Sequence, residues 1–102
     1  MHKQSYLTLL QENREKDSIG QDITESYSEA LAPCLYRSVS QTEQQEAYRR
    51  GFDAECRCEV FFLDYSGESL CEWQGKRYEI YRTYEVNDRI ELYLGTRIGE
   101  DR

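Results

Sequence analysis

The sequence predicts one mainly β domain, a small antiparallel β-barrel of six or seven strands with one short helix in a long loop. Apolar and polar residues alternate along the second half of the chain, which is typical of strands with one buried face. Short turn sequences built from Gly, Asn, Asp and Ser separate these alternating stretches. Aromatic residues make up 13% of the chain and nine of them are Tyr, which favours half-buried strands over disorder.

The N-terminal part of the chain is predicted to form three strands. Residues 5–11 carry three leucines in an extended-looking segment. The polar residues that follow end in a turn sequence at 17–20 (Asp-Ser-Ile-Gly), which would join the first strand to a second over residues 22–28 in a hairpin. A third strand is predicted over residues 29–40, with Pro33 at an edge or a bulge because proline cannot donate to a sheet ladder.

The next segment carries the signature of a helix start. Ser40-Gln41-Thr42-Glu43 matches the capping-box pattern, in which a serine side chain caps the helix and a glutamate three residues later reciprocates. A short helix is expected to run to about Arg50 and to end at Gly51.

The C-terminal half is predicted to add four strands, over residues 55–65, 70–73, 77–86 and 89–94. In the third of these, four apolar or aromatic residues share one parity and are expected on one face: Tyr78, Ile80, Tyr84 and Val86. A flat sheet of so many strands would expose its apolar face, so closure into a barrel is expected.

Composition limits the domain count, the partners and the compartment. One domain over residues 1–102 is expected, with loose ends at 1–4 and 99–102. The formal charge of −7, from 13 basic and 20 acidic residues, repels phosphate and disfavours tight nucleic-acid binding. The chain shows neither an apolar stretch long enough to span a membrane nor an export signal, so we expect a cytoplasmic protein with no membrane partner.

Four cysteines raise the question of disulfides or a metal site. Without an export signal, the side chains are expected to be reduced thiols. Cys56 and Cys58 would point to the same face of a strand, with Cys34 and Cys71 as candidate further ligands. Because this spacing differs from that of zinc knuckles, buried structural thiols are favoured over a metal site.

The sequence offers no set of residues arranged for catalysis, and neither a cofactor nor a metal is expected. The single histidine, His2, lies near the terminus, so a catalytic triad would lack its base. A polar segment is expected to be solvated or to face a channel through six charged residues: Glu43, Glu46, Arg49, Arg50, Asp53 and Glu55. Four tyrosines are expected in the barrel core and in subunit interfaces: Tyr78, Tyr81, Tyr84 and Tyr93.

Three blocks near the C-terminus resemble, in sequence and in order, the head-tail joining proteins of long-tailed bacteriophages and prophages. They are the turn Asp-Tyr-Ser-Gly-Glu at residues 64–68, the strand Gly-Lys-Arg-Tyr-Glu-Ile-Tyr-Arg-Thr-Tyr at 75–84 and the closing strand Ile-Glu-Leu-Tyr-Leu at 90–94. The early turn and the segment before the helix are similar too, so the resemblance covers about residues 6–99. The stretch 44–53 departs from the family's pattern.

The resemblance implies a structural virion protein, a head-completion or stopper subunit that is not an enzyme. Copies of the chain would form a ring below the portal and adaptor of the phage head, close the DNA channel after packaging and dock the tail through a tail completion protein. Packaged double-stranded DNA would pass without sequence-specific binding, since an acidic lumen offers its phosphates few attachment points. The chain would then reside in the virion connector, and in the bacterial cytoplasm before assembly.

Residues 40–55 form the longest polar excursion between predicted strands, so they are hypothesised to fold inward and obstruct the channel. A plain surface helix is the alternative for this segment. Two alternatives also stay open for the whole chain. One is a tail-completion ring protein of the same particle, and the other is a small-barrel module of the bacterial host that binds an extended peptide at a sheet edge.

Overall fold

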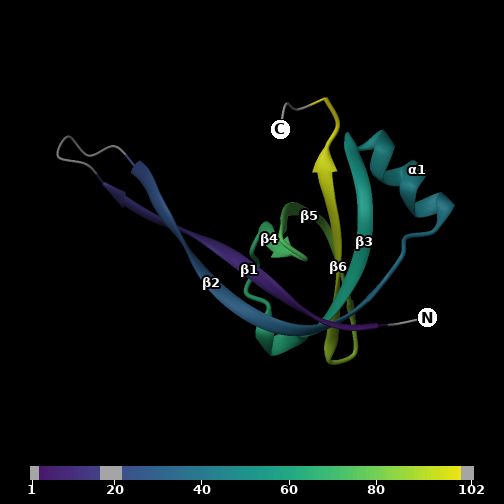
Figure 1. Ribbon diagram of the computed structural model, residues 1–102, viewed down its shortest axis with the longest axis horizontal. Helices are drawn as coiled ribbons and strands as arrows, with labels where there is room; N and C mark the ends of the chain where they lie inside the picture. Colours follow the sequence, from purple (N-terminus) through teal and green to yellow (C-terminus); the bar gives the residue numbers. More distant parts are fainter. Residues whose placement is uncertain (1–2, 17–21, 100–102) are drawn as a thin grey trace.

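Six antiparallel strands close into a barrel in the order β1-β2-β3-β6-β5-β4 (Figure 1). The structure is a computed structural model that describes residues 3–16 and 22–99, and one short helix lies within these ranges. The elements are β1 (Lys3–Lys16), β2 (Asp22–Arg37), α1 (Gln41–Arg49), β3 (Phe52–Phe61), the 3-10 turn η1 (Phe62–Asp64), β4 (Leu70–Trp73), β5 (Lys76–Val86) and β6 (Arg89–Arg97). The predicted mainly β barrel is confirmed.

The N-terminal part forms one long hairpin instead of the three predicted strands. β1 and β2 pair from Lys3↔Tyr36 to Lys16↔Asp22, with one irregularity next to Asn13. The polar run before residue 17, which was expected to lead into a turn, is therefore part of β1 and pairs with β2. The backbone N–H and C=O groups form these hydrogen bonds whichever side chains the residues carry. The predicted turn at 17–20 lies outside the described residues. Lys3 and residue 4, expected in a loose end, belong to β1.

Pro33 occupies a locally open edge of β2, as predicted. It faces Tyr6 of β1, whereas pairing of β2 with β3 begins only at Leu35. Its missing N–H therefore costs no ladder bond on the side of β3.

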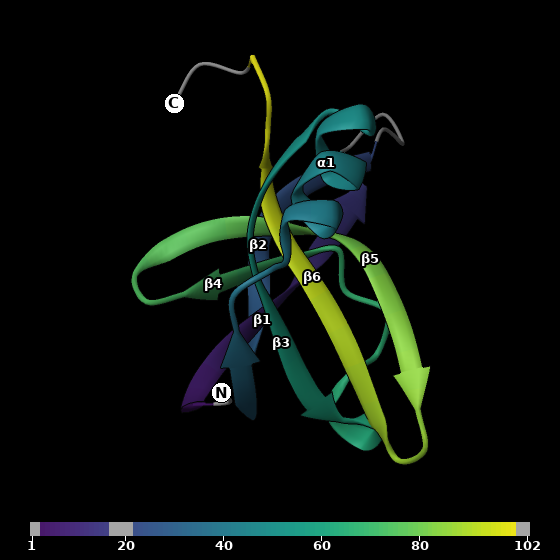
Figure 2. The ribbon, with the colours of Figure 1, turned by 90° about the vertical axis from the view of Figure 1, so that its right-hand side faces the viewer.

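The predicted helix and its cap are confirmed. The Ser40 hydroxyl accepts from the Glu43 backbone N–H at 3.2 Å, and the Glu43 carboxylate accepts from the Ser40 N–H at 2.8 Å. Gly51 follows the C-cap with φ +90°, a conformation that glycine adopts without strain. Figure 2 shows α1 outside the barrel, next to β3 and β6. α1 lies in the connection between β2 and β3, residues 38–51, and occupies most of this predicted loop.

The C-terminal strands follow the prediction with two corrections. β3 covers Phe52–Phe61 and not residues 55–65, because η1 turns the chain away after Phe61. In β5 a bulge between Ile80 and Arg82 reverses the alternation. Tyr78 is therefore buried while Tyr84 and Val86 are exposed, so the prediction that they share a face is wrong.

The barrel interior is narrow and is filled by small and branched side chains. Its fully buried wall residues come from five strands: Leu7, Leu9, Ala32, Cys58, Val60, Cys71, Leu92 and Leu94. Trp73 packs against Tyr36 with ring centroids 4.8 Å apart, and against Tyr78 at 6.4 Å. These rings add large apolar surface to a core otherwise built mainly from small and branched side chains.

Replacement of Gly95 by alanine is expected to lower the free energy of unfolding by about 1–3 kcal/mol. A Cβ at this buried position of β6 would lie 2.8 Å from the carbonyl oxygen of Asp53 and 3.1 Å from the Tyr81 ring. Urea denaturation followed by Trp73 fluorescence measures the change. Thr96→Ala, at the half-exposed next position, is the control and should change the stability less. Equal stability of Gly95→Ala and the wild type would contradict the expectation.

Candidate functional site

A charged residue, Arg57, lies buried between α1 and the barrel wall. It comes from β3, where its neighbours Cys56 and Cys58 face the interior, so its own side chain points outward beneath the helix. Its Nη1 donates to Glu43 Oε2 at 2.7 Å and to the Tyr93 hydroxyl at 3.0 Å. Glu91 Oε1 lies 3.7 Å from the same nitrogen. One guanidinium thus joins α1, β3 and β6.

Glu43 serves both the helix cap and this buried ion pair. One carboxylate oxygen accepts from the Ser40 backbone and the other accepts from Arg57. The start of α1 is therefore fixed to β3 by the same side chain that closes its first turn. Apolar contact adds little, since Ala47 is the one buried residue of the helix.

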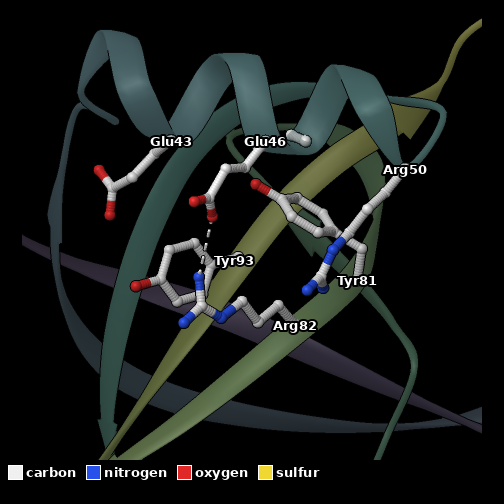
Figure 3. A pocket seen from close by; sticks show the side chains of 7 residues that line it. Glu43, Glu46, Arg50, Tyr81, Arg82 and Tyr93 are labelled. Atoms are coloured by element: carbon white, nitrogen blue, oxygen red, sulfur yellow. Dashed lines mark ion pairs between the residues drawn. The ribbon is translucent and has the colours of Figure 1, made fainter.

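A small hollow continues this polar layer toward β5 (Figure 3). Glu46 reaches Arg82 at 3.7 Å, and the guanidinium of Arg82 lies 5.0 Å from the centroid of the Tyr93 ring. Burial, followed by the charge of Glu43, raises the pKa of Tyr81 to about 12. The hollow has a volume of about 10 Å³, room for roughly one water molecule and no substrate. This arrangement fastens a helix and is too small to serve as a binding site for a ligand.

The six charged residues expected in a channel segment are placed on α1 and at the start of β3. Glu43 and Glu46 make the ion pairs described above, and Arg50 lines the hollow. Arg49, Asp53 and Glu55 are exposed. The structure thus brings three of the six together at the hollow, although Glu46 and Arg50 are exposed like the other three.

The four tyrosines expected in core and interfaces divide between these two environments. Tyr78 and Tyr93 are buried, Tyr81 is half-buried and stacks on Phe52 with centroids 5.0 Å apart, and Tyr84 is 54% exposed. Among these four, Tyr84 alone offers most of its side chain to a partner.

All four cysteines lie in the barrel core as free thiols. The Sγ atoms of Cys56 and Cys58 are 3.9 Å apart. A hydrogen bond between Cys34 and Cys58 lowers the pKa of Cys34 and raises that of Cys58, while burial raises the pKa of Cys71 to about 12. Within residues 3–16 and 22–99, no group of three or more Cys, His, Asp or Glu is arranged to hold a metal ion.

Exposed apolar side chains that the sequence did not single out gather in two places. Tyr6, Leu31 and Pro33 lie on the outer face of the β1–β2 hairpin, where Tyr6 pairs with Pro33 and Leu31 pairs with Thr8; we call these three residues the hairpin patch. The second place lies around η1, where Phe62 is 45% and Leu63 is 69% exposed. Arg57 was likewise missed, although its place between two cysteines, as the one basic residue in a strand whose other charges are acidic, was its signal.

Figure 1 shows the β1–β2 hairpin projecting from the barrel. β1 pairs with β4 only at Thr8–Leu10 and β2 pairs with β3 only at Leu35–Arg37, so residues 11–16 and 22–28 pair only with each other. We call these two stretches the arm. Their outer backbone edges are open to a further strand.

Comparison with protein-family models and with curated proteins finds no match to this chain. No helix in the described part of the chain is long and apolar enough to cross a membrane.

Glu43→Ala is expected to cost about 2–4 kcal/mol of unfolding free energy, because it removes the capping box and leaves Arg57 buried without its closest carboxylate. Glu46→Ala, which breaks only the more exposed pair with Arg82, is the matched control and should cost less than about 1 kcal/mol. Urea denaturation of both variants measures the difference. Equal losses would refute a special role for the Arg57–Glu43 pair.

Stability is expected to fall as the pH rises from about 9 toward 12. The pKa of Cys71 is raised from 9.0 to about 12 in the folded chain, so the unfolded chain loses this proton first and is favoured above pH 9. Below pH 9 the contribution is fully present. Cys71→Ala should flatten the fall by up to about 1.4 kcal/mol per pH unit.

Denaturation in reducing buffer at several pH values measures this slope. Val60→Ala is the control, because it also removes buried core volume but no titrating group. A slope equally steep in Cys71→Ala and Val60→Ala would show that Cys71 does not cause the fall.

Proposed function

We propose that this chain is a head-tail joining subunit of a tailed bacteriophage or prophage, which forms a ring below the portal and adaptor and closes the DNA channel after packaging. The observation that carries the proposal is the order of the three sequence blocks at residues 64–68, 75–84 and 90–94. In the structure these blocks form the loop that follows η1, most of β5 and the central part of β6, and β5 and β6 are neighbours in the barrel wall.

The arrangement of exposed surfaces supports a structural role. A ring of identical copies needs two different, complementary surfaces on each subunit, and further surfaces toward the rings above and below. The arm leaves backbone edges open, the hairpin patch exposes Tyr6 and Leu31, and Phe62 and Leu63 are exposed around η1. Open strand edges and neighbouring exposed apolar side chains favour contacts with other chains.

The segment proposed to obstruct the channel is α1 with the start of β3. It is held to the barrel mainly by polar contacts from Glu43 and Glu46, with one small apolar residue buried. A helix attached in this way is released at lower cost than one with a broad apolar face. Deletion of residues 43–53 should therefore weaken DNA retention; filled heads that keep their DNA as well as with the wild-type chain would remove this part of the proposal.

The ring function is tested with tail-less, DNA-filled heads of the encoding phage that carry portal and adaptor but lack this chain. The purified chain should bind these heads and stop DNA leakage, measured as nuclease-sensitive DNA over time. Leu31→Glu is expected to fold normally, since Leu31 is 68% exposed, but to retain less DNA because it places a charge in the hairpin patch. Glu29→Lys, exposed on the same strand, is the control.

Binding to isolated tails and not to filled heads would contradict the joining role and would favour a tail-completion ring. Failure to bind either structure would remove the virion assignment altogether.

A further inference from the structure

A groove runs along the open side of β5. β4 pairs with β5 only from Lys76 to Glu79, and the Ile80 N–H donates to the Ser69 carbonyl at 2.9 Å. From there to Val86, β5 pairs only with β6 among the described residues. The groove lies between this free edge and the segment that follows β3, and has a volume of about 600 Å³. Its walls include Phe62, Tyr65, Thr83, Glu85, Asp88 and Ile90.

The bulge in β5 gives the two faces of this edge different chemistry. Thr83 and Glu85 lie opposite Leu92 and Ile90 of β6, so they share the face that lines the groove. Tyr84 and Val86 point to the other face, where their side chains are 54% and 38% exposed. In a strand that paired with this edge, alternate side chains would therefore point into the groove. The remaining side chains would contact the apolar surface of Tyr84 and Val86.

The groove itself combines aromatic walls with negative charge. Phe62, Tyr65 and Ile90 supply the apolar lining, and Glu85 and Asp88 supply the carboxylates. No Lys or Arg lines it, and neither carboxylate forms an ion pair within the described residues. Lys and Arg side chains fit such a surface, because their stems pack on apolar groups and aromatic faces while the cationic heads reach the carboxylates.

We propose that this groove binds an extended strand of a different protein, in which Lys or Arg residues alternate with apolar residues. The strand adds to the free edge of β5, its basic side chains lie in the groove and its apolar side chains cover Tyr84 and Val86. A second copy of this chain fits poorly, since each copy carries a net charge of −7 and the groove is acidic. The inference does not rest on the joining role, because a strand-binding groove would serve a ring subunit and a host module alike.

The probe is a short labelled peptide that alternates Arg or Lys with Val or Tyr, and its binding is measured by fluorescence anisotropy at low and moderate salt. The comparison peptides are a scrambled sequence of the same composition and an alternating version with Glu in place of the basic residues. The alternating basic peptide should bind at least about tenfold more tightly than either. Comparable binding of the basic and the scrambled peptide would overturn the proposal.

The place where the peptide binds is tested with Glu85→Lys, which reverses the charge of an exposed groove residue. Glu29→Lys on β2 is the matched control. Glu85→Lys should weaken peptide binding about tenfold and Glu29→Lys should leave it nearly unchanged. Backbone amide signals in residues 81–86 should shift and become protected from exchange when the peptide binds. Shifts confined to α1 or to the arm would overturn the proposal. Self-association of the chain that is lost in Glu85→Lys would also overturn it, because the groove would then bind a second copy.

Discussion

The barrel depends on a narrow belt of strand pairing that closes the sheet. β1 reaches β4 through three residue pairs, Thr8↔Glu72 to Leu10↔Leu70, and β2 reaches β3 through three more. At this belt Leu7 and Leu9 point inward onto Cys58, Cys71 and the leucines of β6, so closure and core packing depend on the same residues. The strands continue past the belt on both sides, which leaves the arm at one end and the free edge of β5 at the other.

Charged side chains hold the helix to the outer face of the barrel, whereas apolar side chains pack against one another on its inner face. Arg57 is the link, because it occupies an outward position of a strand whose inward positions are buried thiols. Burial of its guanidinium costs free energy that only well-placed partners offset, and Glu43 and Tyr93 supply them. The helix is thereby positioned by two or three polar contacts, which fixes its orientation without a second hydrophobic core.

The functional surfaces follow from this construction. Core side chains fill the interior of the barrel, and the hollow under α1, on its outer face, has room for about one water molecule. Open backbone edges lie on the arm and along β5, and exposed apolar side chains lie in the hairpin patch and around η1. The hairpin patch lies close to the end of β5, because Tyr6 and Pro33 share a hollow with Arg89, which pairs with Val86. Ring formation and strand binding along β5 would therefore use neighbouring surfaces.

The sequence by itself determined the elements whose signals are local. The capping box at Ser40 and Glu43, the two-residue turns at 74–75 and 87–88, and the alternation of Ile90, Leu92 and Leu94 each depend on neighbours in the chain. Tertiary structure alone decided the bulge in β5, the length of the arm and the burial of Arg57. Each of these depends on pairing or packing between segments far apart in the sequence, where backbone hydrogen bonds outweigh side-chain polarity and a distant carboxylate makes a buried charge tolerable.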